Sequence, residues 1–148
     1  MYTLIVWLLV TFSASNPDFN LIEATSQNYV GGQAAAGKGT NYKVMLVTKS
    51  ASKKISIEQV WCDSIWFTVE TFNTSNQKIN AFEKNDTLVL YFSKHIKTDE
   101  LGKTKNENVK TAAPINFSGK ALISYKKKNI QKYFAIENFT QLQDQIRR

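Results

Sequence analysis

The sequence has very few of the side chains on which disulfide frameworks and metal centres depend. Its 148 residues include one cysteine and one histidine. Cys62 alone cannot close an intramolecular disulfide, and His95 with Asp99 supplies two ligands where zinc sites have three or four. We therefore expect no disulfide, no metal site and no cofactor. Because Cys62 follows Trp61 in an apolar run, we predict that its thiol is buried and unreactive.

Recognisable catalytic and nucleotide-binding motifs are also missing. The chain has no Gly-x-Ser-x-Gly nucleophile elbow, and we interpret His95 as a solvated loop residue. Residues 32–38 match the first seven positions of the phosphate-binding motif GxxxxGK[ST], but Gly39 stands where Ser or Thr must hold Mg²⁺. The next segment alternates like a strand, whereas the motif requires a helix. We predict a Gly-rich connection between strands over residues 31–39.

Arginine is almost absent, although the chain is basic. The formal net charge is +7, yet the only arginines are Arg147 and Arg148, so lysines supply the other cationic side chains. The planar guanidinium dominates bidentate recognition of phosphate and guanine, so its scarcity disfavours a nucleic-acid partner. Four lysines around the last predicted hairpin leave a polyanion-binding surface open as an alternative function: Lys126, Lys127, Lys128 and Lys132.

No apolar run is long enough to span a bilayer. The longest, residues 4–10, is uncharged and is followed by small residues ending in Ser15. This pattern predicts a signal peptide over residues 1–15, a mature chain beginning at Asn16 without a membrane span, and a secreted or periplasmic location. The usual basic residues ahead of the run are missing. The alternative is that this run forms a first, buried strand.

From about Glu23 onward, apolar and polar residues alternate with a period of two. This pattern predicts a single domain, residues 16–148, made of short antiparallel strands. The predicted strands span residues 24–30, 41–49, 54–61, 65–72, 87–93, 119–126 and 132–138. Polar pairs and triplets at residues 63–64, 84–86 and 127–129 predict the turns between them.

Seven strands in one domain imply two packed sheets. We predict an all-β antiparallel sandwich with immunoglobulin-like architecture, and a barrel is the alternative. The Cys and Trp spacing of true immunoglobulin domains is missing. Two segments depart from the strand pattern: a long polar loop over residues 95–113 and a short helix over residues 141–146, capped by Thr140.

The aromatic residues provide the main functional hypothesis. In the strand beginning at Ile65, alternation places Trp66 and Glu70 on the polar face, with Trp61 near the same turn. Exposed tryptophans beside carboxylates and amides are typical of surfaces that bind sugars or proteins. We therefore predict a non-enzymatic binding module in which Trp61, Trp66 and Glu70 contact a glycan or an envelope protein. Packing of Trp66 beneath a loop or the C-terminal tail is the competing interpretation.

A second class of function remains open, because glycosidases need only two carboxylates. Glu58, Asp63 and Glu70 lie in or near the tryptophan-containing hairpin, so a hydrolase is an alternative. Four Asn-x-Ser/Thr sequences would accept glycans in a eukaryotic secreted protein, at Asn73, Asn85, Asn116 and Asn138.

Two segments carry a resemblance to a known group of proteins. GGQAAAGKGTNY, residues 31–42, and APINFSGKALISY, residues 113–125, resemble small uncharacterised secreted β-sandwich proteins of bacteria. The resemblance covers most of the chain after Ser26 and lies in turn and strand residues. It implies a β-sandwich and an envelope or extracellular location, and it carries no activity.

Overall fold

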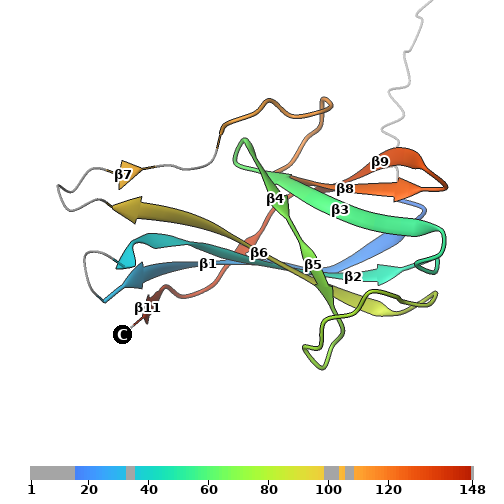
Figure 1. The fold of residues 1–148 in the computed structure, drawn as a ribbon, viewed down its shortest axis with the longest axis horizontal. Helices are drawn as coiled ribbons and strands as arrows, with labels where there is room; N and C mark the ends of the chain where they lie inside the picture. Colours follow the sequence, from blue (N-terminus) through green and yellow to red (C-terminus); the bar gives the residue numbers. More distant parts are fainter. Residues whose placement is uncertain (1–15, 33–35, 99–103, 106–108, 148) are drawn as a thin grey trace, which may run out of the picture.

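The protein folds into two β-sheets that pack against each other (Figure 1). The computed structural model describes residues 16–32, 36–98, 104–105 and 109–147, so the predicted signal peptide lies outside the described residues. The strands are β1 (Phe19–Gly31), β2 (Lys38–Thr48), β3 (Ile55–Cys62), β4 (Ile65–Thr68), β5 (Glu70–Phe72), β6 (Thr87–Thr98), β7 (Thr104–Lys105), β8 (Ala121–Lys127), β9 (Ile130–Ile136), β10 (Thr140–Gln141) and β11 (Gln145–Arg147).

The strand order is that of an immunoglobulin-like sandwich. One sheet runs β10–β1–β2–β6–β5, with β11 also beside β1 and β7 beside β6, and the other runs β4–β3–β8–β9. If β1, β2, β6 and β5 are taken as strands A, B, E and D, the facing sheet supplies C′, C, F and G. The sheets do not close on each other. The predicted sandwich is therefore confirmed, and the barrel alternative is wrong.

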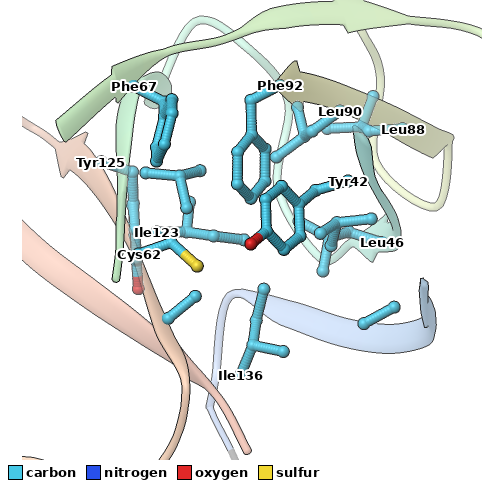
Figure 2. Packing of buried hydrophobic residues seen from close by; sticks show 14 of the residues in the cluster. Tyr42, Leu46, Cys62, Phe67, Leu88, Leu90, Phe92, Ile123, Tyr125 and Ile136 are labelled. Atoms are coloured by element: carbon cyan, nitrogen blue, oxygen red, sulfur yellow. The ribbon is translucent and has the colours of Figure 1, made fainter. Parts of the chain in front are cut away.

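Alternating side chains from both sheets form one apolar core between them. Val44 and Leu46 on β2, and Leu88 and Leu90 on β6, are fully buried against inward residues of the facing sheet such as Ile123. Figure 2 shows Tyr42 beside Phe92, with the Tyr42 hydroxyl directed towards Cys62. The period of two detected in the sequence therefore marks the residues that face this core.

The turns adopt the backbone conformation that the sequence predicts. Asp63 and Ser64 have φ angles of 51° and 65°, and Lys128 and Asn129 have φ angles of 51° and 63°. Positive φ at both central residues is the signature of two-residue hairpins whose twist matches that of the strands. Asn85, with φ of 69°, lies in the predicted turn before β6. These three turn predictions are confirmed.

The Gly-rich segment connects antiparallel strands, as predicted. Strand β1 pairs with β2 through to Val30 and Lys38, and Gly37 has a φ of 70°. A strand rather than a helix begins at Lys38, so the helix required by a phosphate-binding loop is absent. Residues 33–35 of this connection lie outside the described residues.

The predicted C-terminal helix over residues 141–146 is wrong. This segment contributes β10 and β11, which pair in parallel with β1. An isolated six-residue helix has too few hydrogen bonds to offset its nucleation, whereas the edge of β1 offers unpaired backbone groups. No helix in the described part of the chain has the length and apolar character needed to cross a membrane.

Two other predicted segments need correction. Strand β6 continues to Thr98 and pairs with β7, so the predicted loop over residues 95–113 is strand at its beginning. The predicted strand over residues 65–72 divides at Val69, where β4 ends in one sheet and β5 begins in the other. Continuous alternation cannot reveal such a crossing, because both halves keep the same period.

Candidate functional site

The surface of the β4–β3–β8–β9 sheet that faces away from the core carries both tryptophans of the sequence hypothesis. We call this surface the outer face. Three rows of side chains cross it from strand to strand: Trp66, Trp61, Leu122 and Ala135; Thr68, Gln59, Ser124 and Tyr133; and Ser56, Lys126 and Gln131. Neighbouring strands lie about 4.8 Å apart, so the four strands give a platform roughly 14 Å wide.

The hairpin between β3 and β4 brings the two tryptophans together. The turn at Asp63 and Ser64 places Trp61 directly opposite Trp66. Both indole rings are partly buried. Two of the three residues predicted to bind a ligand therefore share one surface.

The segment over residues 109–117 covers one end of the outer face. The backbone N–H of Thr111 donates to the Ser64 carbonyl at 2.6 Å, and the Trp61 indole N–H donates to the Thr111 carbonyl at 3.1 Å. Phe117 packs edge-on against Trp61, with ring centroids 5.7 Å apart. Leu122, the neighbour of Trp61 in the same row, is only 1% exposed although it points away from the core. Trp61 therefore has a structural role in anchoring this segment.

The remainder of the outer face is open and mixed in chemistry. Trp66 is partly exposed and makes no hydrogen bond or aromatic pair with any other described residue. Gln59 and Thr68, in the adjacent row, are exposed, and Tyr133 is partly exposed. A partly exposed indole beside amide and hydroxyl groups can stack on the apolar face of a sugar while its neighbours bind hydroxyls.

Glu70 does not belong to this surface. It lies on β5, in the other sheet, where it pairs with Tyr91 of β6. Its carboxylate accepts a hydrogen bond from the Lys78 ammonium at 2.6 Å. The crossing at Val69 thus separates Glu70 from Trp66, which sequence alternation alone had placed on one face.

The three carboxylates of the hydrolase alternative are held in separate ion pairs. Glu58 lies 3.0 Å from Lys126, and Asp63 lies 3.3 Å from Lys94. Glu70 pairs with Lys78 in the other sheet. Each carboxylate is therefore neutralised by a different lysine, an arrangement unlike the facing pair of carboxyl groups that glycoside hydrolysis requires.

The four lysines of the polyanion alternative do not form one positive surface. Lys127 and Lys132 are directed to Asp18, and Lys126 pairs with Glu58. Lys128 lies in the turn before β9. The structure instead brings Lys53 and Lys54 next to this turn. The Lys128 N–H donates to the Lys54 carbonyl at 3.1 Å.

A buried carboxylate network at the start of the described chain was missed by sequence reasoning. Asp18 is fully buried; it accepts hydrogen bonds from the Tyr125 hydroxyl at 2.7 Å and from the Lys127 ammonium. Lys132 lies 3.9 Å away, and the Asn16 amide donates to the Tyr125 hydroxyl at 3.3 Å. This network fastens the chain ahead of β1 to β8 and β9, more than a hundred residues away in sequence.

The electrostatic balance at Asp18 favours the ionised carboxylate. Burial by itself raises the pKa of Asp18, but hydrogen bonds from Lys127 and Tyr125 and the positive charges of Lys127 and Lys132 outweigh it. The pKa is therefore lowered from its ordinary value of 3.8. Lys127 and Lys132 therefore share one internal anion.

The remaining reactive side chains are held in structural contacts. His95 lies in strand β6 and not in the loop predicted for it, and its Nδ1 lies 2.6 Å from the Tyr29 hydroxyl across the sheet. Cys62 is buried, and burial together with the nearby Asp63 charge raises the pKa of its thiol to about 11. The structure thus places Cys62 in the core, as predicted. Among the described residues, no three His, Cys, Asp or Glu side chains gather as metal ligands.

Comparison of the chain with protein-family models, curated proteins and solved structures found no match. Inference about function therefore depends on the surfaces of this chain itself.

Proposed function

We propose that this protein is an exported, non-enzymatic binding module that recognises a glycan on the open part of its outer face. The observation that supports this proposal is Trp66, a partly exposed indole on the sheet surface. The adjacent row carries Gln59 and Thr68, with Tyr133 at its far end. Rigid aromatic rings lose little entropy on binding, and amide and hydroxyl groups supply directional hydrogen bonds. The segment over residues 109–117 forms a wall at one end of this platform.

The test compares two tryptophan variants with different expected outcomes. Trp66→Ala should abolish retention on a glycan array, or weaken it at least tenfold, with little change in the urea midpoint of unfolding. Trp61→Ala should lower that midpoint, because Trp61 anchors the segment over residues 109–117.

A matched control comes from the other sheet. Tyr91 is 39% exposed on β6, so Tyr91→Ala removes an exposed ring of similar size without touching the outer face. Glycan retention should survive this change. Absence of glycan retention by the unmodified protein, or equal retention by Trp66→Ala, would contradict the proposal.

Export is tested by the mature N-terminus. The apolar run over residues 4–10, and the resemblance to secreted sandwich proteins, both support cleavage near Ser15. Mass spectrometry of protein recovered from the periplasm or medium should find a chain beginning at Asn16. A full-length chain in the cell interior would contradict export and leave the glycan proposal to its own test.

A further inference from the structure

A groove of about 430 Å³ lies beside the first half of β3. One wall is formed by residues 55–57, and the other by the crossover from β4 to β5 and by residues 78–82. Five apolar side chains line it: Ile55, Ile57, Val69, Ile79 and Phe82. Its volume falls in the range of ligand sites, roughly 300–1,000 Å³.

The groove runs along a strand edge that is open. Strand β4 pairs only with residues 59–62 of β3, because the chain leaves this sheet at Val69 to enter β5 (Figure 1). Residues 55–57 of β3 therefore pair with β8 on one side and with no described strand on the other. An edge of this kind can accept another extended segment.

The turn between β8 and β9 determines which backbone groups of β3 face the groove. Lys127 and Ile130 flank this two-residue turn and hydrogen-bond to each other, so the backbone groups of Lys126 point the opposite way, towards β3. Lys126 is paired with Ser56. The N–H and C=O of Ser56 are therefore used in the ladder with β8.

The immediate neighbours of Ser56 must point the other way. The N–H and C=O of Ile55 and Ile57 face away from β8, along the open edge. A register shift between Ile57 and Gln59, which leaves Glu58 as an extra residue, produces this arrangement. The same shift turns the side chains of Ile55 and Ile57 inward, so the edge presents backbone donors and acceptors above an apolar floor.

A second hollow, of about 320 Å³, adjoins the groove and gives it a charge. Its lining includes Lys53, Lys54, Lys126 and Lys128, and it shares Ser52, Ile55 and Ser56 with the groove. Lys126 pairs with Glu58, whereas the other three lysines form no ion pair with any described residue. Three uncompensated ammonium groups at one end of an apolar groove favour a ligand that carries carboxylates.

We propose that this groove binds an acidic, extended peptide segment of a partner protein, which adds a short strand beside residues 55–57. The peptide backbone hydrogen-bonds to Ile55 and Ile57, as in other strand-addition complexes. Alternate apolar side chains of the peptide enter the groove against Ile79 and Phe82, and its carboxylates meet Lys53 and Lys54. This site is separate from Trp66 and does not depend on glycan binding.

The direct test is a nitrogen-15 NMR titration of the full chain with a capped hexapeptide of alternating glutamate and valine. Saturable shifts should centre on the amides of Ile55 and Ile57, and hydrogen exchange at these two amides should slow at least tenfold. A peptide with the same side chains and N-methylated backbone should not bind, because it lacks the donors of a strand. Binding of the N-methylated peptide, or an absence of shifts at both amides, would overturn the proposal.

Two double variants separate a local charge effect from the overall charge of the protein. Lys53→Glu with Lys54→Glu should weaken binding of the acidic hexapeptide at least tenfold. Lys38→Glu with Lys120→Glu changes the net charge equally. Lys38 begins β2 and Lys120 directly precedes β8, at the end of the sandwich away from Lys53 and Lys54, so this pair should leave the affinity within twofold. Equal weakening by both pairs would overturn the peptide site in favour of general polyanion attraction.

A third variant keeps this test distinct from that of the glycan. Trp66→Ala should bind the hexapeptide with unchanged affinity, because Trp66 does not line the groove. Loss of peptide binding in Trp66→Ala would overturn the proposed site. Glycan retention has no bearing on the outcome.

Discussion

At the scale of single residues, Asp18 is a buried charge that depends on its polar partners. A fully buried carboxylate is costly unless its charge is compensated, and here a hydroxyl and two ammonium groups compensate it. Asp18→Asn removes the charge and leaves Lys127 without its partner. We expect the free energy of unfolding at neutral pH to fall by about 2 kcal/mol, measured by urea denaturation.

The same side chain gives a pH dependence with a definite sign. Because the pKa of Asp18 is lowered below 3.8 in the folded chain, the stability it contributes is present above that pH and is lost as the pH falls through the lowered value. The difference between the unmodified chain and Asp18→Asn should therefore be smaller below pH 3.8 than at neutral pH. Asp144→Asn, at an exposed position, is the control and should change stability little at either pH.

Cys62 gives a second prediction for a single residue. Burial and then the Asp63 charge raise the pKa of its thiol to about 11, so at about pH 8 only about a thousandth of it is thiolate. Alkylation by iodoacetamide should be at least a hundredfold slower in the native chain than in urea. Rapid alkylation of the native chain would show that Cys62 is accessible to solvent and would contradict its burial in the core.

A raised thiol pKa also predicts how stability changes in alkali. The contribution of the protonated thiol is present below its ordinary pKa of 9.0 and is lost as the pH rises through about 11. Cys62→Ala should therefore show a weaker fall in stability between these two values. Its unfolding midpoint at neutral pH gives the separate packing effect of the lost side chain.

At the scale of elements, the β3–β4 hairpin holds a non-glycine residue in an unfavourable conformation. Ser64 has a φ of 65°, in the left-handed region that favours glycine. Ser64→Gly should raise the free energy of unfolding by about 0.5 kcal/mol. Ser75→Gly is the matched control, because Ser75 lies in an exposed turn without positive φ, and it should give no gain.

The C-terminal strands protect the outer edge of β1. Strands β10 and β11 pair with β1 through Thr25 to Gly31, so removing residues 140–148 should expose unpaired backbone. Phe139 remains in this truncation and keeps its edge contact with Tyr42 at 5.1 Å. We expect the shortened chain to self-associate with rising concentration in analytical ultracentrifugation.

A point variant separates backbone pairing from side-chain effects. Ile146 is 76% exposed, so Ile146→Lys leaves the pairing with β1 intact and should remain as monomeric as the parent chain. If the truncated chain self-associates no more than the parent chain, the C-terminal strands are not needed to protect this edge.

Local features of these elements could be predicted from the sequence, and non-local features could not. Alternation at Val44 and Leu46 and the turn at Asp63 and Ser64 depend on neighbouring residues, and the structure confirms both. The Asp18 network joins elements 107 residues apart, from Asp18 to Tyr125, so no local pattern indicates it. The pairing of β10 and β11 with β1 was missed for the same reason, because the partner strands lie at opposite ends of the described chain.

The candidate sites show the same division. The sequence placed Trp61 and Trp66 near one turn, and the structure brings them opposite each other. It could not separate Glu70 from them, because the crossing at Val69 preserves alternation. The register shift at Glu58 was also hidden, since its effect on β3 appears only in the pairing with β8.

At the scale of the whole molecule, one shared core predicts cooperative unfolding. Inward residues of both sheets pack together, so neither sheet keeps its apolar surface buried without the other. In a chain beginning at Asn16, which lacks Trp7, fluorescence of Trp61 and Trp66 reports on the smaller sheet. Far-ultraviolet circular dichroism reports on all strands, and alkylation of Cys62 reports on the core. The three urea transitions should coincide, with a spectrum that lacks helical minima. If the tryptophan signal instead changes at a lower urea concentration than the dichroism, the smaller sheet unfolds separately, and the chain is not the single cooperative domain that its composition and alternation predict.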